Sequence, residues 1–403
     1  MIKRETYLQK IRPFFNQNLI KVLTGIRRCG KSVMLDQIKT ELMDLGIESN
    51  QIIAINLESG EWLLKNQVEL LYDYVKVRIN QTKKNYLFLD EIQEINGWER
   101  AVNAFLVDFD IDIYITGSNA KLLSGELATH LGGRYVEFSI YPFSFAEVCE
   151  IKRDKGLDVD IQKVFQTYLR MGGMPFIYES DIDESSQKKY LSDIYDSVVL
   201  KDIVGRNNVR NIDLLQWILL FLMANIGNPF SSSAVIKFLK NEKRSISQET
   251  IYNYINYCEA ACFAHLVVRE DIVGKQILKF QEKIYLTDHG FREVVYGNNE
   301  RDIQQILENI VYLELLRRGY EVRIGKVSTR EVDFIAIKGN QREYYQVSYI
   351  LAEETTIERE FSPLESITDN FPKYVLTMDA FDRSRNGIKH VNIVDFLSGE
   401  YED

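Results

Sequence analysis

The residues of this chain that could do chemistry begin with a short glycine-containing stretch, GIRRCGKS. It places Gly25, Gly30, Lys31 and Ser32 at the spacing G-x-x-x-x-G-K-S/T. Glycines here let consecutive N–H groups turn inward around phosphate oxygens, the lysine ammonium suits the β- and γ-phosphates, and the serine hydroxyl is a hard ligand for Mg²⁺. The spacing therefore predicts a nucleotide-binding loop made of Gly25, Ile26, Arg27, Arg28, Cys29, Gly30, Lys31, Ser32 and Val33.

The segments on both sides of this loop fit that prediction. Residues 19–24 (LIKVLT) form an apolar run typical of a buried strand, and residues 32–46 have helical periodicity that ends at Gly46. A phosphate held by the loop would then lie at a helix N-terminus, where the helix dipole favours anions. Arg27 and Arg28 either add positive charge near the phosphates or are simply solvated, and both alternatives stay open.

A second strand supplies two acidic residues at its end. Residues 86–89 (YLFL) are an unbroken apolar run, as expected of a central parallel strand, and Asp90 and Glu91 follow directly. Together with Ser32, Asp90 is predicted to hold Mg²⁺, and Glu91 is predicted to polarise the attacking water. The alternative is a strand followed by an acidic helix cap.

A third predicted strand, residues 111–119 (IDIYITGSN), ends in polar residues. Ser118 and Asn119 fall where open α/β sheets bind ligands, so either could orient the water and sense the γ-phosphate. Arg134 precedes a further strand that begins at Tyr135, and it is a candidate arginine finger that would act on a neighbouring subunit. It could equally be a surface arginine in a glycine turn.

Composition and length limit the classes of protein to which the chain can belong. With 403 residues, 45% hydrophobic and 27% charged, we expect a globular protein of two or three domains. The net charge of -10 disfavours a protein that coats nucleic acid. The longest apolar stretch, residues 214–225, is shorter than the roughly 20 residues that span a bilayer. Together with only four scattered cysteines, this predicts a cytoplasmic protein without a membrane partner.

Several stretches together resemble a widespread family of prokaryotic AAA-type ATPases whose C-terminal region is a domain of unknown function. They are LIKVLTGIRRCGKSVML, FLDEIQEINGWE, YITGSNAKLLSGE, LGGRYVEFSIYPFSFAE, MGGMPFIY, LKDIVGRNNVRN, KIYLTDHG and EVDFIA, so the resemblance covers nearly the whole chain. It implies an ATPase core, a winged-helix segment and a C-terminal fold similar to PD-(D/E)XK nucleases. It also implies that the nucleotide is ATP.

The middle of the chain has the elements of a winged helix. Three helices are predicted from residue 214, over 234–241 and over 247–260, followed by two strands separated near Gly274. The third helix carries Glu249 and Glu259 but no basic residue, which favours a protein-facing or structural role over tight DNA binding. If DNA is bound, the residues expected to contact it are Gln248, Asn253, Asn256, Lys237, Lys240, Lys243 and Arg244.

The C-terminal third matches the nuclease pattern incompletely. Glu308, Asp333 and Gln346 fall where that pattern has its metal-binding residues, but Ser348 takes the place of the lysine that activates water. Gln346 also lowers the negative charge that Mg²⁺ requires. We therefore predict a nuclease-like fold without catalysis.

These observations predict an α/β protein in four parts. Residues 1–155 would form a P-loop NTPase domain with a parallel sheet and helices on both faces, 156–205 a helical linker, 206–290 a winged helix, and 291–403 an α/β restriction-endonuclease-like domain. The leading hypothesis is a Mg²⁺-dependent ATPase that couples the state of ATP to the C-terminal parts. Two alternatives are a slow nucleotide-dependent switch that recruits a protein or DNA partner, and a metal nuclease. Arg134 acting as a finger would require a homo-oligomer.

Overall fold

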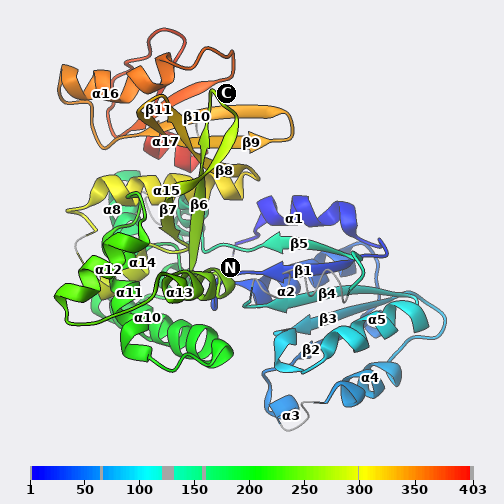
Figure 1. The fold of residues 1–403 in the computed structure, drawn as a ribbon. Helices are drawn as coiled ribbons and strands as arrows, with labels where there is room; N and C mark the ends of the chain where they lie inside the picture. The colour runs from blue at the N-terminus through cyan, green and yellow to red at the C-terminus, as the bar shows by residue number, and fades with distance from the viewer. Residues whose placement is uncertain (1, 64–66, 120–130, 157–159, 298, 400–403) are drawn as a thin grey trace. The chain divides into compact units, whose positions relative to one another are not determined.

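The computed structural model describes residues 2–63, 67–119, 131–156, 160–297 and 299–399 of the protein (Figure 1). The chain divides into two compact units. The first contains Met1–Tyr141 and Ala260–Cys262, and the second contains Pro142–Glu259 and Phe263–Asp403. Among the described residues, no helix combines the length and apolar composition needed to cross a bilayer.

The first unit is built on a five-stranded sheet whose strand order is β2-β3-β4-β1-β5. All of its pairings are parallel. The strands are β1 (Ile20–Thr24), β2 (Ile52–Asn56), β3 (Asn85–Asp90), β4 (Ile111–Gly117) and β5 (Tyr135–Ser139). Every residue of β1, β3 and β4 is buried, as expected of central parallel strands. Two charged residues within them, Lys21 of β1 and Asp112 of β4, are buried as an ion pair.

Helices cover both faces of this sheet, as predicted. Leu87 and Leu89 of β3 belong to the same buried cluster as Val102 and Phe105 of α5 (Trp98–Asp108). Phe88 points to the opposite face because successive strand residues alternate, and there it meets α2 (Lys31–Asp44), whose Lys39 Nζ lies 6.0 Å from the Phe88 ring centre. The remaining helices of this unit are α1 (Glu5–Ile11), α3 (Gly60–Leu63), α4 (Val68–Lys76) and the 3-10 helices η1 (Arg12–Phe14), η2 (Ser49–Gln51) and η3 (Ile92–Glu94).

Parallel pairing brings the carboxyl ends of the central strands to one edge of the sheet. Thr24, the last residue of β1, is paired with Gly117 of β4, and Leu89 of β3 is paired with Ile115 of β4. The segments that follow β1, β3 and β4 therefore leave the sheet side by side. This edge is where the predicted nucleotide site lies.

The second unit begins with helices. They are α7 (Phe145–Asp154), α8 (Ile161–Met171), α9 (Pro175–Glu179), α10 (Glu184–Ser197), the π-helix η5 (Val198–Gly205), α11 (Ile212–Ala224), α12 (Ser232–Asn241) and α13 (Gln248–Ala260). The Ser247 Oγ accepts a hydrogen bond from the Thr250 N–H (3.1 Å), as a serine that caps the N-terminus of α13 does. The later helices are α14 (Gly290–Val295), α15 (Ile303–Arg317), α16 (Glu354–Glu365) and α17 (Ile393–Ser398).

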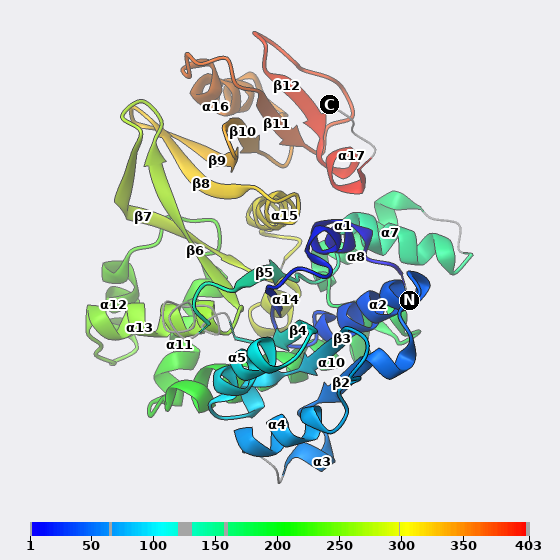
Figure 2. The same ribbon diagram turned by 90° about the vertical axis from the view of Figure 1, so that its right-hand side faces the viewer.

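A seven-stranded mixed sheet completes the second unit, with the strand order β12-β11-β10-β9-β8-β6-β7 (Figure 2). The strands are β6 (Ala264–Asp271), β7 (Gln276–Leu286), β8 (Glu321–Val327), β9 (Arg330–Lys338), β10 (Gln341–Val347), β11 (Lys373–Thr377) and β12 (Lys389–Asn392). Gly339 and Asn340 form the turn between β9 and β10, which are antiparallel and pair Lys338 with Gln341.

The β6–β7 hairpin and the later strands belong to this same sheet, since β6 is paired with β8. The predicted boundary between residues 290 and 291 therefore separates strands that share one sheet, and the four-part division of the chain stays a prediction. Helix α15 packs on one face, where the Tyr312 ring lies 6.0 Å from that of Phe334. On the other face α16 buries Phe361 in a cluster with Ile335 and Tyr344.

Candidate functional site

The predicted phosphate loop follows β1 and has the backbone shape that its glycines allow. Gly25 has φ 151° and Gly30 has φ 102°, both values that side chains disfavour. A Cβ atom at Gly25 would lie 2.2 Å from the carbonyl oxygen of Ile140, so only glycine fits there. Gly30 is the N-cap of α2, and Lys31 and Ser32 are its first helical residues. The loop thus ends at a helix N-terminus, as the sequence predicted.

Lys31 is buried and its ammonium is held inside the loop. Lys31 Nζ donates to the carbonyl oxygens of Gly25 (3.2 Å) and Ile26 (3.3 Å). It also forms an ion pair with Glu91 Oε1 at 3.4 Å. The lysine of the loop and Glu91, the acid directly after β3, are therefore in direct contact.

Asp90 and Glu91 share the hydroxyl of Thr116, which ends the neighbouring strand. Thr116 Oγ1 donates to Asp90 Oδ1 (2.5 Å) and accepts from the Glu91 N–H (2.9 Å). Ser118 Oγ donates to Glu91 Oε2 at 2.8 Å, and Gln93 Nε2 donates to the same oxygen. Sequence reasoning assigned no role to Thr116, although its place at a strand end next to two polar residues was a usable signal.

These contacts keep the Glu91 carboxylate ionised. Burial opposes ionisation, but Lys31 and the hydrogen bonds from Gln93 and Ser118 outweigh it and lower the pKa of Glu91 to about 2. Glu91 itself has φ 55°, a left-handed conformation that is uncommon for a residue with a side chain. The segment after β3 thus holds an anionic side chain against the loop lysine.

Ser32 and Asp90, the two predicted metal ligands, both line a cavity of about 280 Å³ beside the loop. Ser32 is exposed and Asp90 is largely buried. A serine hydroxyl and a carboxylate are hard oxygen donors of the kind that Mg²⁺ prefers. The residues present therefore fit the ion that the sequence implied.

The two loop arginines differ from each other. Arg27 is mostly buried, and its Nη1 forms an ion pair with Glu58 Oε1 at 3.1 Å. Arg28 is exposed and has φ 68°. Cys29 is buried and donates through its Sγ to the Ile140 carbonyl oxygen (3.1 Å), and burial raises the pKa of its thiol. Arg28 is therefore solvated, whereas Arg27 is mostly buried and paired with Glu58.

The two remaining predicted residues lie in different places. Asn119 is half-buried and follows Ser118 at the edge that carries the loop. Arg134 is exposed, donates to Asn103 Oδ1 (3.1 Å), and precedes the first residue of β5. Tyr135 is paired with Ile20 at the start of β1, so Arg134 lies at the opposite edge of the sheet from the loop. Its action as a finger on a neighbouring subunit stays a prediction.

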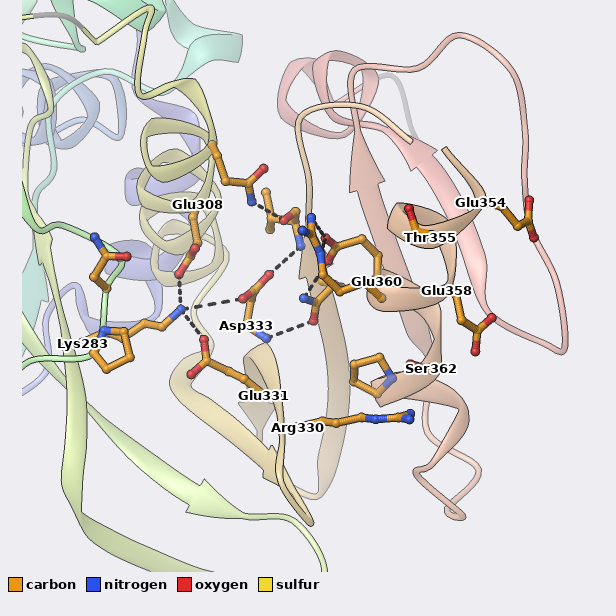
Figure 3. A pocket seen from close by; sticks show the side chains of 18 residues that line it. Lys283, Glu308, Arg330, Glu331, Asp333, Glu354, Thr355, Glu358, Glu360 and Ser362 are labelled. Carbon is orange, nitrogen blue, oxygen red and sulfur yellow. Dashed lines mark hydrogen bonds and ion pairs between the residues drawn. The ribbon is translucent and has the colours of Figure 1, made fainter. Parts of the chain in front are cut away.

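A second cluster of charged residues lines a pocket of about 1060 Å³ in the second unit (Figure 3). At its base, Lys283 Nζ of β7 lies 2.7 Å from Glu308 Oε1 of α15 and 2.7 Å from Glu331 Oε1 of β9. Asp333 Oδ1 is 3.7 Å from the same ammonium. Tyr285 donates its hydroxyl to Glu308 Oε1. One buried ammonium thus faces three carboxyl groups.

The three nuclease-pattern residues come together in this pocket. Asp333 Oδ2 accepts from the Val347 N–H (2.9 Å), and Gln346 Oε1 accepts from the Asp333 N–H (3.3 Å). Gln346 Nε2 donates to Glu360 Oε2 (2.9 Å). Sequence reasoning missed Lys283, Glu331 and Glu360, and no signal singled out Lys283, because the strand of residues 276–286 also contains Lys279.

Electrostatics at the base of the pocket differ from those at the loop. Burial and the neighbouring Glu308 raise the pKa of Asp333 well above its usual value. For Lys283, burial favours the neutral amine, but the carboxylates of Glu308, Asp333 and Glu331 outweigh it and raise its pKa. Among the residues that the structure describes, no group of three acidic, histidine or cysteine side chains is arranged to hold a metal ion.

The residues proposed to contact DNA are only partly free to do so. Gln248, Asn253 and Asn256 of α13 are exposed, as are Lys237, Lys240 and Lys243. Arg244 instead pairs with Asp213, and its guanidinium lies 5.5 Å from the ring centre of Trp217. In this basic stretch the three lysines are exposed, whereas the fourth cation, Arg244, is paired with Asp213.

Comparisons with known proteins agree with the fold of the first unit. The model of an AAA domain family matches residues 17–149, and that of a domain of unknown function (DUF8612) matches residues 162–302. The Walker-type ATPase PABY2304 of Pyrococcus abyssi has a similar structure, with a TM-score of 0.51 and 16% identity over 73% of this chain and 96% of that one. At this identity the likeness is one of fold.

Two relatives are similar along nearly the whole chain. An uncharacterized protein of Haemophilus influenzae is 38% identical over 399 residues, covering 98% of both chains. Uncharacterized protein MJ1544 of Methanocaldococcus jannaschii is 31% identical over 395 residues, covering 94% of this chain and 85% of its own. The chain belongs to the same family as these two uncharacterized proteins, and its N-terminal part is an AAA-type P-loop ATPase domain.

Proposed function

We propose that this protein binds Mg·ATP in the loop from Gly25 to Ser32 and hydrolyses it. The observation that carries the proposal is the direct contact between Lys31 of the loop and Glu91, the residue directly after β3, at 3.4 Å. A phosphate-binding cation and a water-activating carboxylate must lie this close if both act on one γ-phosphate. Membership of a family with an AAA domain supports nucleotide binding.

In this proposal Ser32 and Asp90 hold Mg²⁺, and Thr116 orients Asp90. The Thr116 hydroxyl donates to Asp90 Oδ1, and Asp90 lines the cavity that Ser32 also lines. Bound Mg²⁺ would neutralise charge that develops on the phosphate oxygens. The loop N–H groups and Lys31 orient the triphosphate, while Ser118 and Asn119 position the water.

Glu91 acts on the water chiefly by accepting a hydrogen bond. With a pKa of about 2 it is ionised at neutral pH, but it is a weak base in this state. The contact with Lys31 is the largest cause that lowers this pKa. Transfer of the Lys31 ammonium to phosphate oxygens would therefore make Glu91 more basic when the nucleotide is in place.

Calorimetry and phosphate release test the proposal directly. We expect the purified protein to bind Mg·ATP and to release phosphate from it. Binding of Mg·GTP with equal affinity would contradict the preference for ATP, and no uptake of either nucleotide by folded protein would contradict the proposal itself.

A slow nucleotide-dependent switch is a second candidate function. In the described structure Glu91 is engaged by Lys31, Gln93 and Ser118 together, which leaves little capacity to bind a water. This favours low basal hydrolysis that rises when a partner rearranges the site. A basal rate that no protein or DNA partner changes would contradict the switch. A turnover rate per protomer that rises with protein concentration would support Arg134 acting in trans within a homo-oligomer.

For the rest of the chain we propose the four parts predicted above, at 1–155, 156–205, 206–290 and 291–403. Helices α11, α12 and α13 with the β6–β7 hairpin support a winged helix. The absence of basic residues from α13 and the engagement of Arg244 by Asp213 favour a protein partner over DNA. Six acidic and three basic residues line the pocket in Figure 3, so it is suited to a cation rather than to a bare phosphate.

Metal-dependent cleavage of nucleic acid is a third reading, which Lys283 makes testable. The sequence pattern lacked a lysine at Ser348, but Lys283 reaches Glu308 and Asp333 from another strand. Cleavage with Mg²⁺ or Mn²⁺ that is lost in both Lys283→Ala and Asp333→Ala would support an active site. If the wild-type protein cleaves no nucleic acid, the pocket is a nuclease-like fold without that activity.

A further inference from the structure

Arg4 lies outside every motif considered so far, yet its side chain contacts the phosphate loop. It precedes α1 and is only 2% exposed. Its Nη1 donates to the carbonyl oxygen of Cys29 (3.3 Å), and its Nη2 donates to the carbonyl oxygen of Tyr141 (2.9 Å). The guanidinium also lies 4.5 Å from the ring centre of Tyr7. Arg4 is therefore a buried cation that joins the loop to the segment after β5.

The hydrogen bond from Arg4 to the Cys29 carbonyl oxygen involves the peptide unit that joins Cys29 to Gly30. A peptide unit is planar and trans, so its C=O and N–H point in opposite directions. When Arg4 draws the Cys29 carbonyl toward itself, the N–H of Gly30 in the same peptide is turned to the other side. Gly30 is the N-cap of α2, where N–H groups face a bound anion. The orientation of this N–H is thus coupled to the position of the Arg4 guanidinium.

The hydrogen bond to Tyr141 holds the guanidinium next to a backbone segment that contacts the loop. The preceding residue, Ile140, accepts from the Cys29 Sγ (3.1 Å) and donates its N–H to the Thr24 carbonyl oxygen (2.7 Å). The Tyr141 N–H itself donates to the Tyr7 hydroxyl (3.1 Å). Arg4 therefore bridges two backbone segments that already touch, and it limits their relative movement.

The N-terminal segment that carries Arg4 is itself fixed to α2, the helix that the loop begins. The Arg4 N–H donates to Gln37 Oε1 (2.9 Å), and Gln37 Nε2 donates to the Ile2 carbonyl oxygen (2.7 Å). Both ends of Arg4 are consequently held, its backbone by α2 and its side chain by Cys29 and Tyr141. A side chain held at both ends can transmit a fixed geometry to the loop.

We propose that Arg4 is a positioning residue for the nucleotide site, which orients the Gly30 amide toward the phosphates of Mg·ATP. The inference rests on the proposed function, because it assigns Arg4 a part in that binding event. Arg4 contacts the backbone of the loop at Cys29, so its effect is on the pre-organisation of the loop. The positive charge of Arg4, buried next to the loop, also favours the binding of phosphate.

The test compares Arg4→Ala, Arg4→Lys and the control Arg12→Ala. Arg12 lies in the same N-terminal segment but pairs with Glu5 and Glu41 away from the loop. By calorimetry, Arg4→Ala should bind Mg·ATP about tenfold to a hundredfold more weakly, the loss expected for hydrogen bonds from a charged donor. Arg4→Lys should recover little of this loss, because one ammonium cannot span both carbonyl oxygens. Arg12→Ala should bind like the wild type.

Chemical rescue separates positioning from simple loss of structure. Added methylguanidine should restore part of the Mg·ATP affinity of Arg4→Ala and leave that of Arg12→Ala unchanged. If Arg4→Ala does not fold, Arg4→Lys, which keeps the charge and most of the stem, is the decisive variant. Wild-type affinity in a folded Arg4 variant would overturn the inference, as would a weakened affinity that methylguanidine does not improve. If the wild type and Arg12→Ala fail to bind, the proposed function falls instead.

Discussion

The phosphate loop of the first unit and the acid pocket of the second both place a lysine against carboxylates, but they are assembled differently. In the loop, Lys31 lies six residues from Gly25 and contacts the carbonyl oxygen of that same glycine. In the pocket, Lys283, Glu308 and Asp333 come from β7, α15 and β9. A site built from consecutive residues leaves a spacing in the sequence, whereas a site built across elements leaves isolated residues.

The two sites also shift their carboxyl groups in opposite directions. Glu91 contacts one cation, Lys31, and accepts hydrogen bonds from Gln93 and Ser118, which together lower its pKa to about 2. Asp333 shares Lys283 with Glu308 and Glu331, so burial and like charge prevail and its pKa rises. The ratio of cations to carboxylates, rather than burial alone, decides the direction.

Removing the loop lysine should abolish nucleotide binding. Lys31→Ala deletes the charge expected to meet the β- and γ-phosphates, and we expect a loss of Mg·ATP affinity of about a hundredfold or more in calorimetry. Lys83→Ala is the matched control, because Lys83 forms an exposed ion pair with Glu48 (2.5 Å). Retained affinity in Lys31→Ala would show that the first site does not use its lysine for phosphate.

Replacing the carboxylate of Glu91 should separate nucleotide binding from turnover. Glu91→Gln keeps the shape of the side chain but removes its charge, so Mg·ATP should still bind while phosphate release slows by about 100- to 10,000-fold. Glu94→Gln, three residues later, should release phosphate at the wild-type rate. Turnover of Glu91→Gln at the wild-type rate would remove Glu91 from the mechanism.

Replacing the pocket lysine should affect stability rather than nucleotide binding. Lys283→Met leaves buried carboxylates without their cation, which should lower the free energy of unfolding by about 3–5 kcal/mol in urea titrations at neutral pH. Lys338→Met, at the exposed end of β9, should change it little. The deficit should shrink in acid as the carboxyl groups become protonated. A Lys283→Met protein as stable as the wild type would mean that the pocket does not depend on this ammonium.

The raised pKa of Asp333 has a predictable sign in pH dependence. Because the folded-state value lies above the ordinary 3.8, the folded protein binds more protons than the unfolded chain above that pH. The contribution of Asp333 is thus fully present below the unfolded-state pKa and is lost as pH rises through the folded-state value, with a slope of up to about 1.4 kcal/mol per pH unit. Asp333→Asn should flatten this decline in urea titrations. An unchanged slope would contradict the shift.

The smallest effect is expected at the exposed loop arginine. Arg28→Ala should change Mg·ATP affinity by less than about threefold, because an exposed charge is strongly screened. Arg27→Ala should have the larger effect, since Arg27 is mostly buried and is held by Glu58. A loss of more than about tenfold in Arg28→Ala would indicate that Arg28 reaches the phosphates directly, at the energy of a charged hydrogen bond.

Much of the first unit could be predicted because its strands are buried on both faces. The apolar runs before Gly25, Asp90 and Ser118 correspond to β1, β3 and β4, and their parallel pairing brings the predicted residues to one edge. Edge strand β2 was missed because its five residues carry no motif, although its three isoleucines are typical of a strand. Arg4 was missed for a different reason, because no pattern links a residue before α1 to the peptide of Cys29.

The amino-acid sequence by itself determined the phosphate loop, the acids after β3 and the class of the N-terminal fold. These depend on local backbone freedom at Gly25 and on apolar periodicity, which are properties of neighbouring residues. Three sets of contacts follow from the tertiary structure alone. Thr116 is hydrogen-bonded to both Asp90 and Glu91, and Arg4 donates a hydrogen bond to Cys29 of the loop. Lys283 forms ion pairs with Glu308 and Asp333. Such contacts join residues distant in the chain, and their geometry follows from how sheets and helices pack.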